Sequence, residues 1–210
     1  MTRKDGVMVI FPKPRPILKW VGGKTKLLDI LLASFPIRMH NYRDIFVGGG
    51  SVLYALLALV RQDRIQVDGN IYAYDINEPL IYMYKNLQTR HQELYKELEI
   101  LKEEFHVCGK TCPSTKKGCA DAEKQYYQKR EQYNQLSPED KKTPLGSALF
   151  IFLNKTCFRG VFRVGPRGFN VPYGHYRNPS IMEKEHFQEI HELIQGVVFE
   201  CADFSSSLAS

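Results

Sequence analysis

A glycine turn followed by a distant acid is the stretch of this sequence best suited to bind a ligand. The apolar residues 45–47 run into the three glycines 48–50, and a second apolar run covers 52–60. This order predicts a strand, a tight turn and a helix. A further apolar segment, 71–74, ends at Asp75. In open α/β sheets such glycines and such an acid bind a nucleoside-bearing cofactor through its ribose, although the glycines alone also suit an ordinary turn.

A basic stretch in the second half of the chain combines cations, aromatic rings and turn residues. Residues 154–179 contain no acid, and their basic residues are Lys155, Arg159, Arg163, Arg167 and Arg177. The segments 161–164 and 169–171 can pair as a β-hairpin across 165–168. Arginines beside aromatic and amide side chains on a projecting hairpin suit phosphates, base edges and base stacking. An ordinary surface hairpin is the alternative interpretation.

Two further motifs do not meet the requirements of the sites that they suggest. Residues 22–25 (Gly-Gly-Lys-Thr) match the end of a phosphate-binding P-loop, but the glycine that should precede them is Leu18. Four potential zinc ligands lie close together in a polar segment: His106, Cys108, Cys112 and Cys119. Their spacing follows no established zinc pattern, so we expect free thiols and no metal.

Strand-like and helix-like segments alternate at both ends of the chain. Predicted strands cover 45–47, 71–74 and 197–201, and predicted helices cover 27–32, 52–61, a stretch from about 79, 144–153 and 183–194. Such alternation is typical of an α/β fold with a mainly parallel sheet. Residues 85–142 are more polar and have helical spacing of their leucines, so we expect a mostly helical insertion there.

The composition limits the class of protein and its location. The net charge of +6 permits a polyanionic partner without requiring one. No apolar run approaches the roughly 20 residues of a membrane helix, and the basic N-terminus lacks the apolar core of an export signal. Five cysteines without a sign of secretion favour reduced thiols. We therefore expect an intracellular protein, located in the cytoplasm, the nucleoid or the nucleus, that is not secreted and does not associate with a membrane.

Several segments, taken in order, resemble the motifs of Dam-type (D12 class) DNA adenine-N6 methyltransferases. The resemblance spans nearly the whole chain, and the motifs occur in the order of the family. The segments that carry it are 18–24 (LKWVGGK), 46–52 (FVGGGSV), 75–77 (DIN), 152–160, 168–174 (GFNVPYG) and 199–204 (FECADF).

The resemblance implies a fold, a domain order and an activity. The expected fold is α/β, a Rossmann-like S-adenosylmethionine-dependent methyltransferase sheet, incomplete at its C-terminal end. A mostly helical target-recognition domain carrying a β-hairpin would be inserted into it. The implied divisions are 1–84 and 181–210 for the methyltransferase part and 85–180 for DNA recognition, with the hairpin at 158–174. The implied activity is methyl transfer from S-adenosylmethionine to adenine N6 in double-stranded DNA.

The resemblance also assigns roles to single residues. Residues expected to bind the cofactor are Trp20, Lys24, Phe46, Gly48, Gly50, Asp75, Asp203 and Phe204. Asp75 would hold the ribose hydroxyls, and Asp203 would accept a hydrogen bond from the adenine amino group with Phe204 against the ring. Residues expected on the DNA-binding hairpin are Phe158, Arg159, Arg163, Asn170 and Pro172.

Three departures from the family pattern limit these expectations. A mild one is Asp44-Ile45-Phe46, where the family often has an acid, a proline and a phenylalanine before the glycine turn. Arg159 stands where the best-known members have an asparagine, which leaves the recognised DNA sequence open. The catalytic Asp-Pro-Pro-Tyr motif, expected soon after Asp203, is absent from the 210 residues. We therefore expect this chain alone to bind S-adenosylmethionine weakly if at all, to methylate nothing, and to leave a sheet edge open. The alternatives are an inactive remnant that binds DNA, or one half of a split enzyme with a complementing C-terminal chain. Genome maintenance, restriction-modification and a viral role all remain open.

Overall fold

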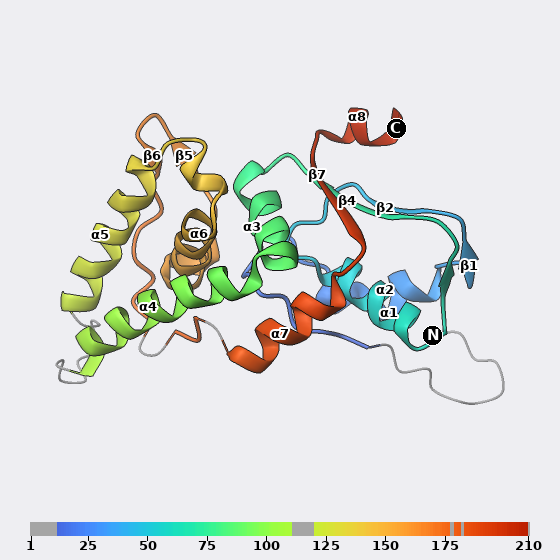
Figure 1. Ribbon diagram of the computed structural model, residues 1–210, viewed down its shortest axis with the longest axis horizontal. Helices are drawn as coiled ribbons and strands as arrows, with labels where there is room; N and C mark the ends of the chain where they lie inside the picture. Colours follow the sequence, from blue (N-terminus) through green and yellow to red (C-terminus); the bar gives the residue numbers. More distant parts are fainter. Residues whose placement is uncertain (1–11, 111–119, 177–178, 182, 210) are drawn as a thin grey trace.

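The computed structural model describes residues 12–110, 120–176, 179–181 and 183–209 of the 210. Helices and short strands combine in a mixed α/β fold, as predicted. Figure 1 shows the strands β2, β4 and β7 on one side of the molecule and the helices α4, α5 and α6 on the other, with α3 between them. None of the helices in these residues is long and apolar enough to cross a membrane.

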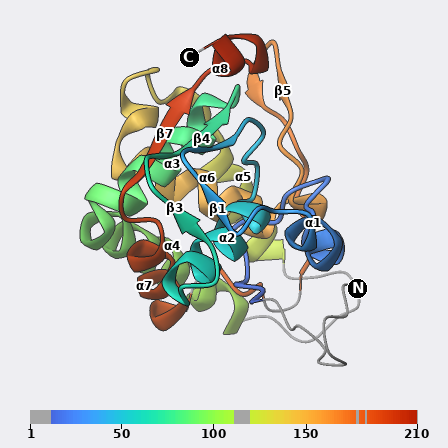
Figure 2. The same cartoon turned by 90° about the vertical axis from the view of Figure 1, so that its right-hand side faces the viewer.

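A three-stranded sheet lies at the centre of the first side. Its strands are β2 (Tyr42–Asp44), β4 (Ile71–Asp75) and β7 (Val197–Cys201). Their order is β2-β4-β7, and both neighbouring pairs are parallel. The short strands β1 (Arg38–Met39) and β3 (Gln66–Val67) form a second parallel pair nearby, visible in Figure 2. Because parallel strands end at one edge, the residues after Asp44, Asp75 and Cys201 come together there.

Six helical segments accompany this sheet. They are η1 (Thr25–Leu27), α1 (Leu28–Ala33), α2 (Ser51–Arg61), α3 (Glu78–Thr89), α7 (Lys184–Leu193) and α8 (Phe204–Ala209). The α3 helix starts at a side-chain cap, since the Asn77 side chain accepts a hydrogen bond from Leu80 N at 3.0 Å. Its N-terminus therefore lies directly after β4.

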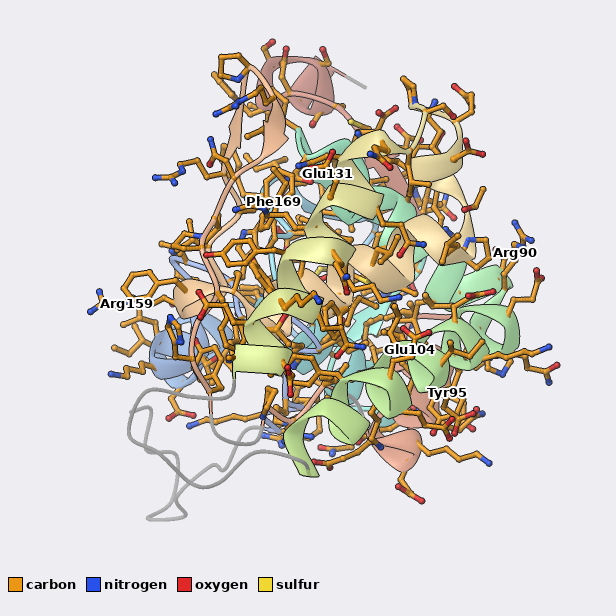
Figure 3. The ribbon with its side chains drawn as sticks, turned by 90° about the vertical axis from the view of Figure 1, so that its left-hand side faces the viewer. Arg90, Tyr95, Glu104, Glu131, Arg159 and Phe169 are labelled. Carbon is orange, nitrogen blue, oxygen red and sulfur yellow. The ribbon has the colours of Figure 1, made fainter. Side chains whose placement is uncertain are left out.

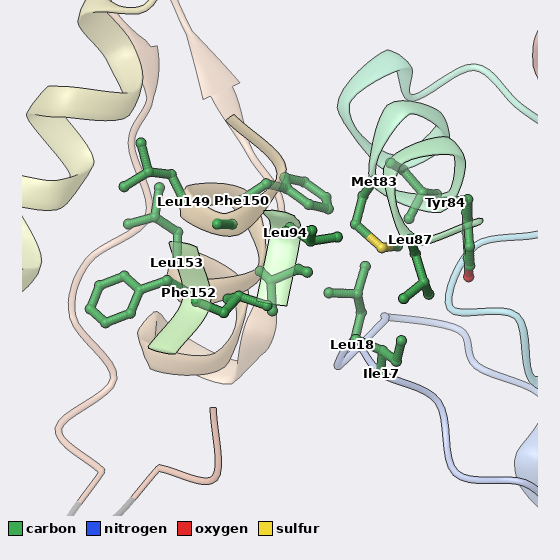
Figure 4. Packing of buried hydrophobic residues seen from close by; sticks show 14 of the residues in the cluster. Ile17, Leu18, Met83, Tyr84, Leu87, Leu94, Leu149, Phe150, Phe152 and Leu153 are labelled. Atoms are coloured by element: carbon green, nitrogen blue, oxygen red, sulfur yellow. The ribbon is translucent and has the colours of Figure 1, made fainter. Parts of the chain in front are cut away.

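The second side is built around one buried helix. Its elements are α4 (His91–Lys110), α5 (Ala120–Gln135), η2 (Asp140–Lys142) and α6 (Pro144–Thr156). The α6 helix packs against α3, α4 and α5, and its residues from 146 to 154 are all buried. In Figure 4, Leu149, Phe150 and Leu153 of α6 face Leu94 of α4 across the main core. This packing confirms the buried helix predicted at 144–153.

A short hairpin follows α6. It begins with η3 (Phe158–Gly160) and contains β5 (Val164–Gly165) and β6 (Gly168–Phe169), which pair antiparallel. Beyond the named strands, Asn170 N donates to Arg163 O at 3.1 Å. The predicted hairpin is confirmed, but its regular strands are shorter than the sequence indicated.

Other predictions hold in type and differ in position. The strand predicted at 45–47 is wrong: the strand is β2, and residues 45–46 form a turn. The turn starts there because the Asp44 carboxylate accepts a hydrogen bond from Phe46 N at 3.2 Å. The predicted strands at 71–74 and 197–201 are confirmed as β4 and β7. The predicted domain boundary between residues 84 and 85 lies inside α3.

The zinc-ligand candidates lie outside what the structure describes. Cys112 and Cys119 fall in the undescribed segment, and the side chains of His106 and Cys108, near the end of α4, are not described. Elsewhere in the described residues, no group of three or more His, Cys, Asp or Glu side chains could hold a metal ion.

Candidate functional site

Hydrogen bonds to the end of β4 hold the glycine turn that follows β2. Asp75 ends β4, and its carboxylate accepts hydrogen bonds from Gly48 N and from Asn77 N, both at 3.0 Å. Val47 N donates to Tyr74 O at 2.9 Å, which continues the pairing of the two strands into the turn. The predicted glycine turn and the predicted acid are therefore in direct contact.

Space around two of the glycines is filled by aromatic side chains. Gly48 and Gly50 have φ angles of +47° and +79°, where other residues are strained. A Cβ atom on Gly48 would lie 2.8 Å from the Trp20 ring, and one on Gly50 would lie 2.8 Å from the Tyr84 hydroxyl. The Tyr84 hydroxyl also donates to Gly48 O at 2.8 Å. These glycines are thus required for internal packing, whatever ligand the turn binds.

The N-terminal signature segment packs onto the same turn. Trp20 is partly buried between the glycines and Phe150 of α6, with the two ring centroids 6.5 Å apart. Lys24 N donates to the Ser51 hydroxyl at the start of α2, at 3.2 Å. The Lys24 side chain is exposed, and its ammonium donates to Gly22 O at 2.8 Å. The structure therefore brings Trp20 and Lys24 to the glycine turn.

Two exposed phenylalanines face each other at the ends of the outer strands. Phe46 follows β2 and Phe204 follows β7, and their side chains are 68% and 55% exposed. Their ring centroids are 6.2 Å apart. Such large exposed aromatic rings next to each other are typical of a site for a flat apolar ligand. Ile76, which is also exposed at the end of β4, was not singled out from the sequence.

Asp203 lies at the same edge but acts as a helix cap in this structure. Its carboxylate accepts hydrogen bonds from Ser205 N at 2.8 Å, from the Ser205 hydroxyl at 2.6 Å and from Ser206 N at 3.1 Å. The Ser205 hydroxyl and these backbone amides lower the pKa of Asp203 below its usual value. The carboxylate is therefore ionised and exposed. A ligand that donates a hydrogen bond to it would compete with the Ser205 and Ser206 groups of α8 that donate to it here.

Asp44 is a second acid at this edge to which the sequence assigned no role. Burial raises the pKa of its carboxyl to about 6, the Phe46 amide lowers it, and the nearby charge of Asp75 raises it. Two carboxylates at the ends of adjacent strands would repel each other if both were ionised. The signal was present in the sequence, since Asp44 lies directly before the apolar residues 45–47 that lead into the glycines.

At the base of the hairpin, Phe158 and Arg159 project together. Phe158 is 49% exposed, and the Arg159 guanidinium lies 5.2 Å from its ring centroid. Arg159 has a φ of 56°, a conformation that is uncommon for residues other than glycine, and its amide donates to the Tyr176 hydroxyl at 3.1 Å. Arg159 points away from the body of the molecule in Figure 3.

Near the hairpin tip, Arg163 and Asn170 form a second exposed pair. Arg163 Nε donates to Asn170 Oδ1 at 2.7 Å, and Arg163 Nη2 donates to Asn170 O at 3.3 Å. Pro172 is exposed, and its carbonyl accepts from Phe158 N at 2.9 Å. All five residues predicted to bind DNA therefore lie on the hairpin.

The sequence analysis missed the contacts that join the hairpin to the N-terminal segment. Asn154 is buried; its Oδ1 accepts from Lys19 N at 2.9 Å, and its Nδ2 donates to Lys19 O at 2.8 Å and to Gly160 O at 3.0 Å. The Lys19 ammonium lies 3.7 Å from the centroid of the Tyr176 ring. Burial, together with the charges of Lys19 and Arg15, lowers the pKa of Lys155 to about 8. The Asn154 amide thus binds both the segment bearing Trp20 and the start of the hairpin.

The fold and these two regions define a mixed α/β protein with a glycine turn at parallel strand ends and a basic hairpin. Residues 20–210 match the family described as D12 class N6 adenine-specific DNA methyltransferase. The chain belongs to this family.

Proteins with similar sequences have names that fit this family. The chain is 35% identical to the Type II methyltransferase M.MjaIII of Methanocaldococcus jannaschii, over 90% of this chain and 62% of that protein. It is 32% identical to the DNA adenine methylase of Escherichia coli K12, over 94% of this chain and 60% of the relative. A 30% identical DNA adenine methylase occurs in Haemophilus influenzae. The chain thus spans about 60% of the length of these relatives.

Proposed function

We propose that this chain binds S-adenosylmethionine at the edge where β2, β4 and β7 end, and binds duplex DNA through the hairpin 158–174. Both would serve an enzyme that methylates adenine N6. The observation that supports this proposal best is the direct bond between Asp75 and Gly48 at 3.0 Å, which joins the two halves of the predicted cofactor motif. Because the chain belongs to a family of N6 adenine-specific DNA methyltransferases, we infer methyl transfer as the reaction that this site serves.

The residues at the strand ends fit a nucleoside with a sulfonium group. Each Asp75 oxygen has one amide donor here, and a carboxylate accepts about four hydrogen bonds, which leaves capacity for ribose hydroxyls. We assign Phe46 and Phe204 to the adenine ring and Asp203 to its amino group. When bound, S-adenosylmethionine would supply an electrophilic methyl group. The 210 residues contain no Asp-Pro-Pro-Tyr sequence, and we assign no catalytic residue to them.

The sheet region and the helical region would then have separate tasks. We infer that residues 1–84 and 181–210 belong to a Rossmann-like methyltransferase part and that 85–180 form the DNA-recognition part. The strands β2 and β7 each have one hydrogen-bonded neighbour among the described residues, so both outer edges of this sheet can accept a further strand. A complementing chain and an intracellular location stay predictions.

DNA binding by the purified chain tests the proposal at the hairpin. We expect labelled duplex DNA to bind with an affinity that falls with salt, because cations that contact phosphates release counterions. Arg159→Ala should weaken binding by about tenfold, the value of one good contact. Arg90→Ala is the matched control, because Arg90 is an exposed arginine that pairs with Glu93 on another face of the molecule (Figure 3). Equal binding by both variants would contradict the proposal.

A further inference from the structure

The hairpin is too short to hold its own shape. Its regular pairing consists of Val164 with Phe169 and Gly165 with Gly168. An isolated two-stranded hairpin is marginally stable in water even when it is longer. Its conformation must therefore be set by another element.

That element is one face of α5. Asn134 Nδ2 donates to Phe169 O at 3.0 Å, and Phe169 N donates to Asn134 Oδ1 at 2.8 Å. One side-chain amide thus satisfies both backbone groups of Phe169, as a neighbouring strand would. Tyr126 OH and Arg130 Nη1 both donate to Val171 O, at 2.7 and 3.2 Å. Residues four apart share a helix face, so this stripe runs alongside the strand segment 169–171.

Packing at the hairpin turn depends on the same asparagine. Gly168 has a φ of +88°, and a Cβ atom there would lie 2.5 Å from Asn134 Oδ1. The Phe169 ring also packs edge-on against Tyr133, with centroids 6.4 Å apart. Figure 3 shows Phe169 beside the α5 ribbon. The turn is therefore built against the end of α5.

Holding this segment fixes the direction of Arg163. Side chains alternate along an extended segment, and Phe169 and Val171 are buried while Asn170 between them is exposed. Asn170 is the residue that accepts from Arg163 Nε at 2.7 Å. The position of the Arg163 guanidinium thus follows from the position of Asn170, and the position of Asn170 follows from the bonds that Asn134 makes to Phe169.

We propose that Asn134 is a positioning residue for DNA sequence discrimination, which it controls by holding the strand segment that orients Arg163. This inference rests on the proposed DNA-binding function of the hairpin. Asn134 is uncharged and does not itself belong to the exposed basic surface. Its removal should therefore change which sequences are preferred, while the salt-dependent attraction to phosphates stays the same.

The test compares sequence discrimination among variants of the full 210-residue chain. A randomised duplex library selected with the wild-type chain supplies the best-bound sequence and its single-base variants as labelled probes. Asn134→Ala should lower the ratio of affinities between the preferred and the mismatched duplex by about tenfold, the value of one oriented arginine–base contact. The slope of affinity against salt should stay at the wild-type value. Gln135→Ala, an exposed neighbour on α5, should change neither quantity.

A double variant separates positioning from general destabilisation. If Asn134 acts through Arg163, the variant Asn134→Ala/Arg163→Ala should discriminate no worse than Arg163→Ala alone. Losses that multiply, or wild-type discrimination in Asn134→Ala, would overturn the inference. If Asn134→Ala does not fold, Asn134→Asp replaces it, because aspartate can still accept from Phe169 N but cannot donate to Phe169 O. A wild-type chain that prefers no sequence would instead overturn the proposed DNA recognition itself.

Discussion

The glycine turn and the hairpin are supported by different kinds of side chain. At the glycine turn, aromatic side chains fill the space beside Gly48 and Gly50, and the turn is buried. At the hairpin, side-chain amides and hydroxyls bind the backbone, chiefly Asn134 and Asn154. Aromatic packing leaves no room for added atoms at the glycine turn, whereas the loss of one asparagine removes several of the hydrogen bonds that hold the hairpin. We therefore expect the proposed cofactor site to be sensitive to added volume and the proposed DNA-binding surface to be sensitive to the loss of these amides.

The largest effect should come from a methyl group added at the glycine turn. Gly50→Ala places a Cβ 2.8 Å from the Tyr84 hydroxyl in a backbone conformation with φ of +79°. Strain and overpacking together should lower the free energy of unfolding by about 3 kcal/mol. Urea denaturation measures this change. Gly196→Ala is the control, because its φ of +81° brings similar strain but nothing lies within 4 Å of its Cβ. Equal losses in both variants would show that packing at the turn is unimportant.

A smaller loss is expected at the base of the hairpin. Asn154→Ala removes three hydrogen bonds and leaves the backbone groups of Lys19 and the carbonyl of Gly160 without this partner. The cost should be about 2 kcal/mol, typical of buried polar groups that lose their partner. Hydrogen exchange should also quicken at Lys19 more than at Gly48. Faster exchange at both amides to the same degree would mean that the two regions are not held separately.

Asp44 gives a pH-dependent effect at the glycine turn. Its pKa is about 6 in the folded protein, above the ordinary value of 3.8, so the folded state holds its proton more tightly than the unfolded state. Stability should therefore fall as pH rises from about 4 to about 6, and the penalty is complete above that range. Asp44→Asn should remove this penalty, raising the free energy of unfolding at pH 7 by about 2 kcal/mol. Asp121→Asn, an exposed acid on α5, is the control.

Urea denaturation at pH 4, 6 and 7 measures the change. The Asp44→Asn and wild-type curves should meet near pH 4 and separate toward pH 7. If the free energies of unfolding of the two proteins differed by the same amount at all three pH values, burial would not disfavour the ionised form of Asp44.

The sequence predicted the glycine turn well because its determinants are local. Glycines and an apolar run follow one another in the chain, so the turn, α2 and the later strand β4 with its terminal acid could be expected from the residues alone. The bond between Gly48 and Asp75, which are 27 residues apart, could not be expected in this way. The start of the turn was misplaced because the bond from Phe46 N to Asp44 competes with strand pairing, and residue types do not show which wins.

The supports of the hairpin could not be predicted because they join distant segments. Asn154 and Lys19 are separated by 135 residues, and Asn134 and Phe169 by 35. Nothing in the type of an asparagine indicates whether its amide will face solvent or bind a remote backbone. The stripe of Tyr126, Arg130 and Asn134 has helical spacing, but its meaning depends on a strand that lies elsewhere in the sequence.

Calorimetric titration of S-adenosylmethionine into the 210-residue chain tests the central claim most directly. From the sequence alone we expect weak binding or none, whereas the preformed glycine turn at the strand ends predicts saturable binding. Asp75→Ala should abolish it, whereas Asp121→Ala, which changes an exposed acid on α5, should leave it intact. Circular dichroism confirms that each variant is folded. A folded wild-type chain that releases no binding heat across a range of temperatures, or an Asp75→Ala variant that binds as the wild type does, would contradict the assignment of this edge as the cofactor site.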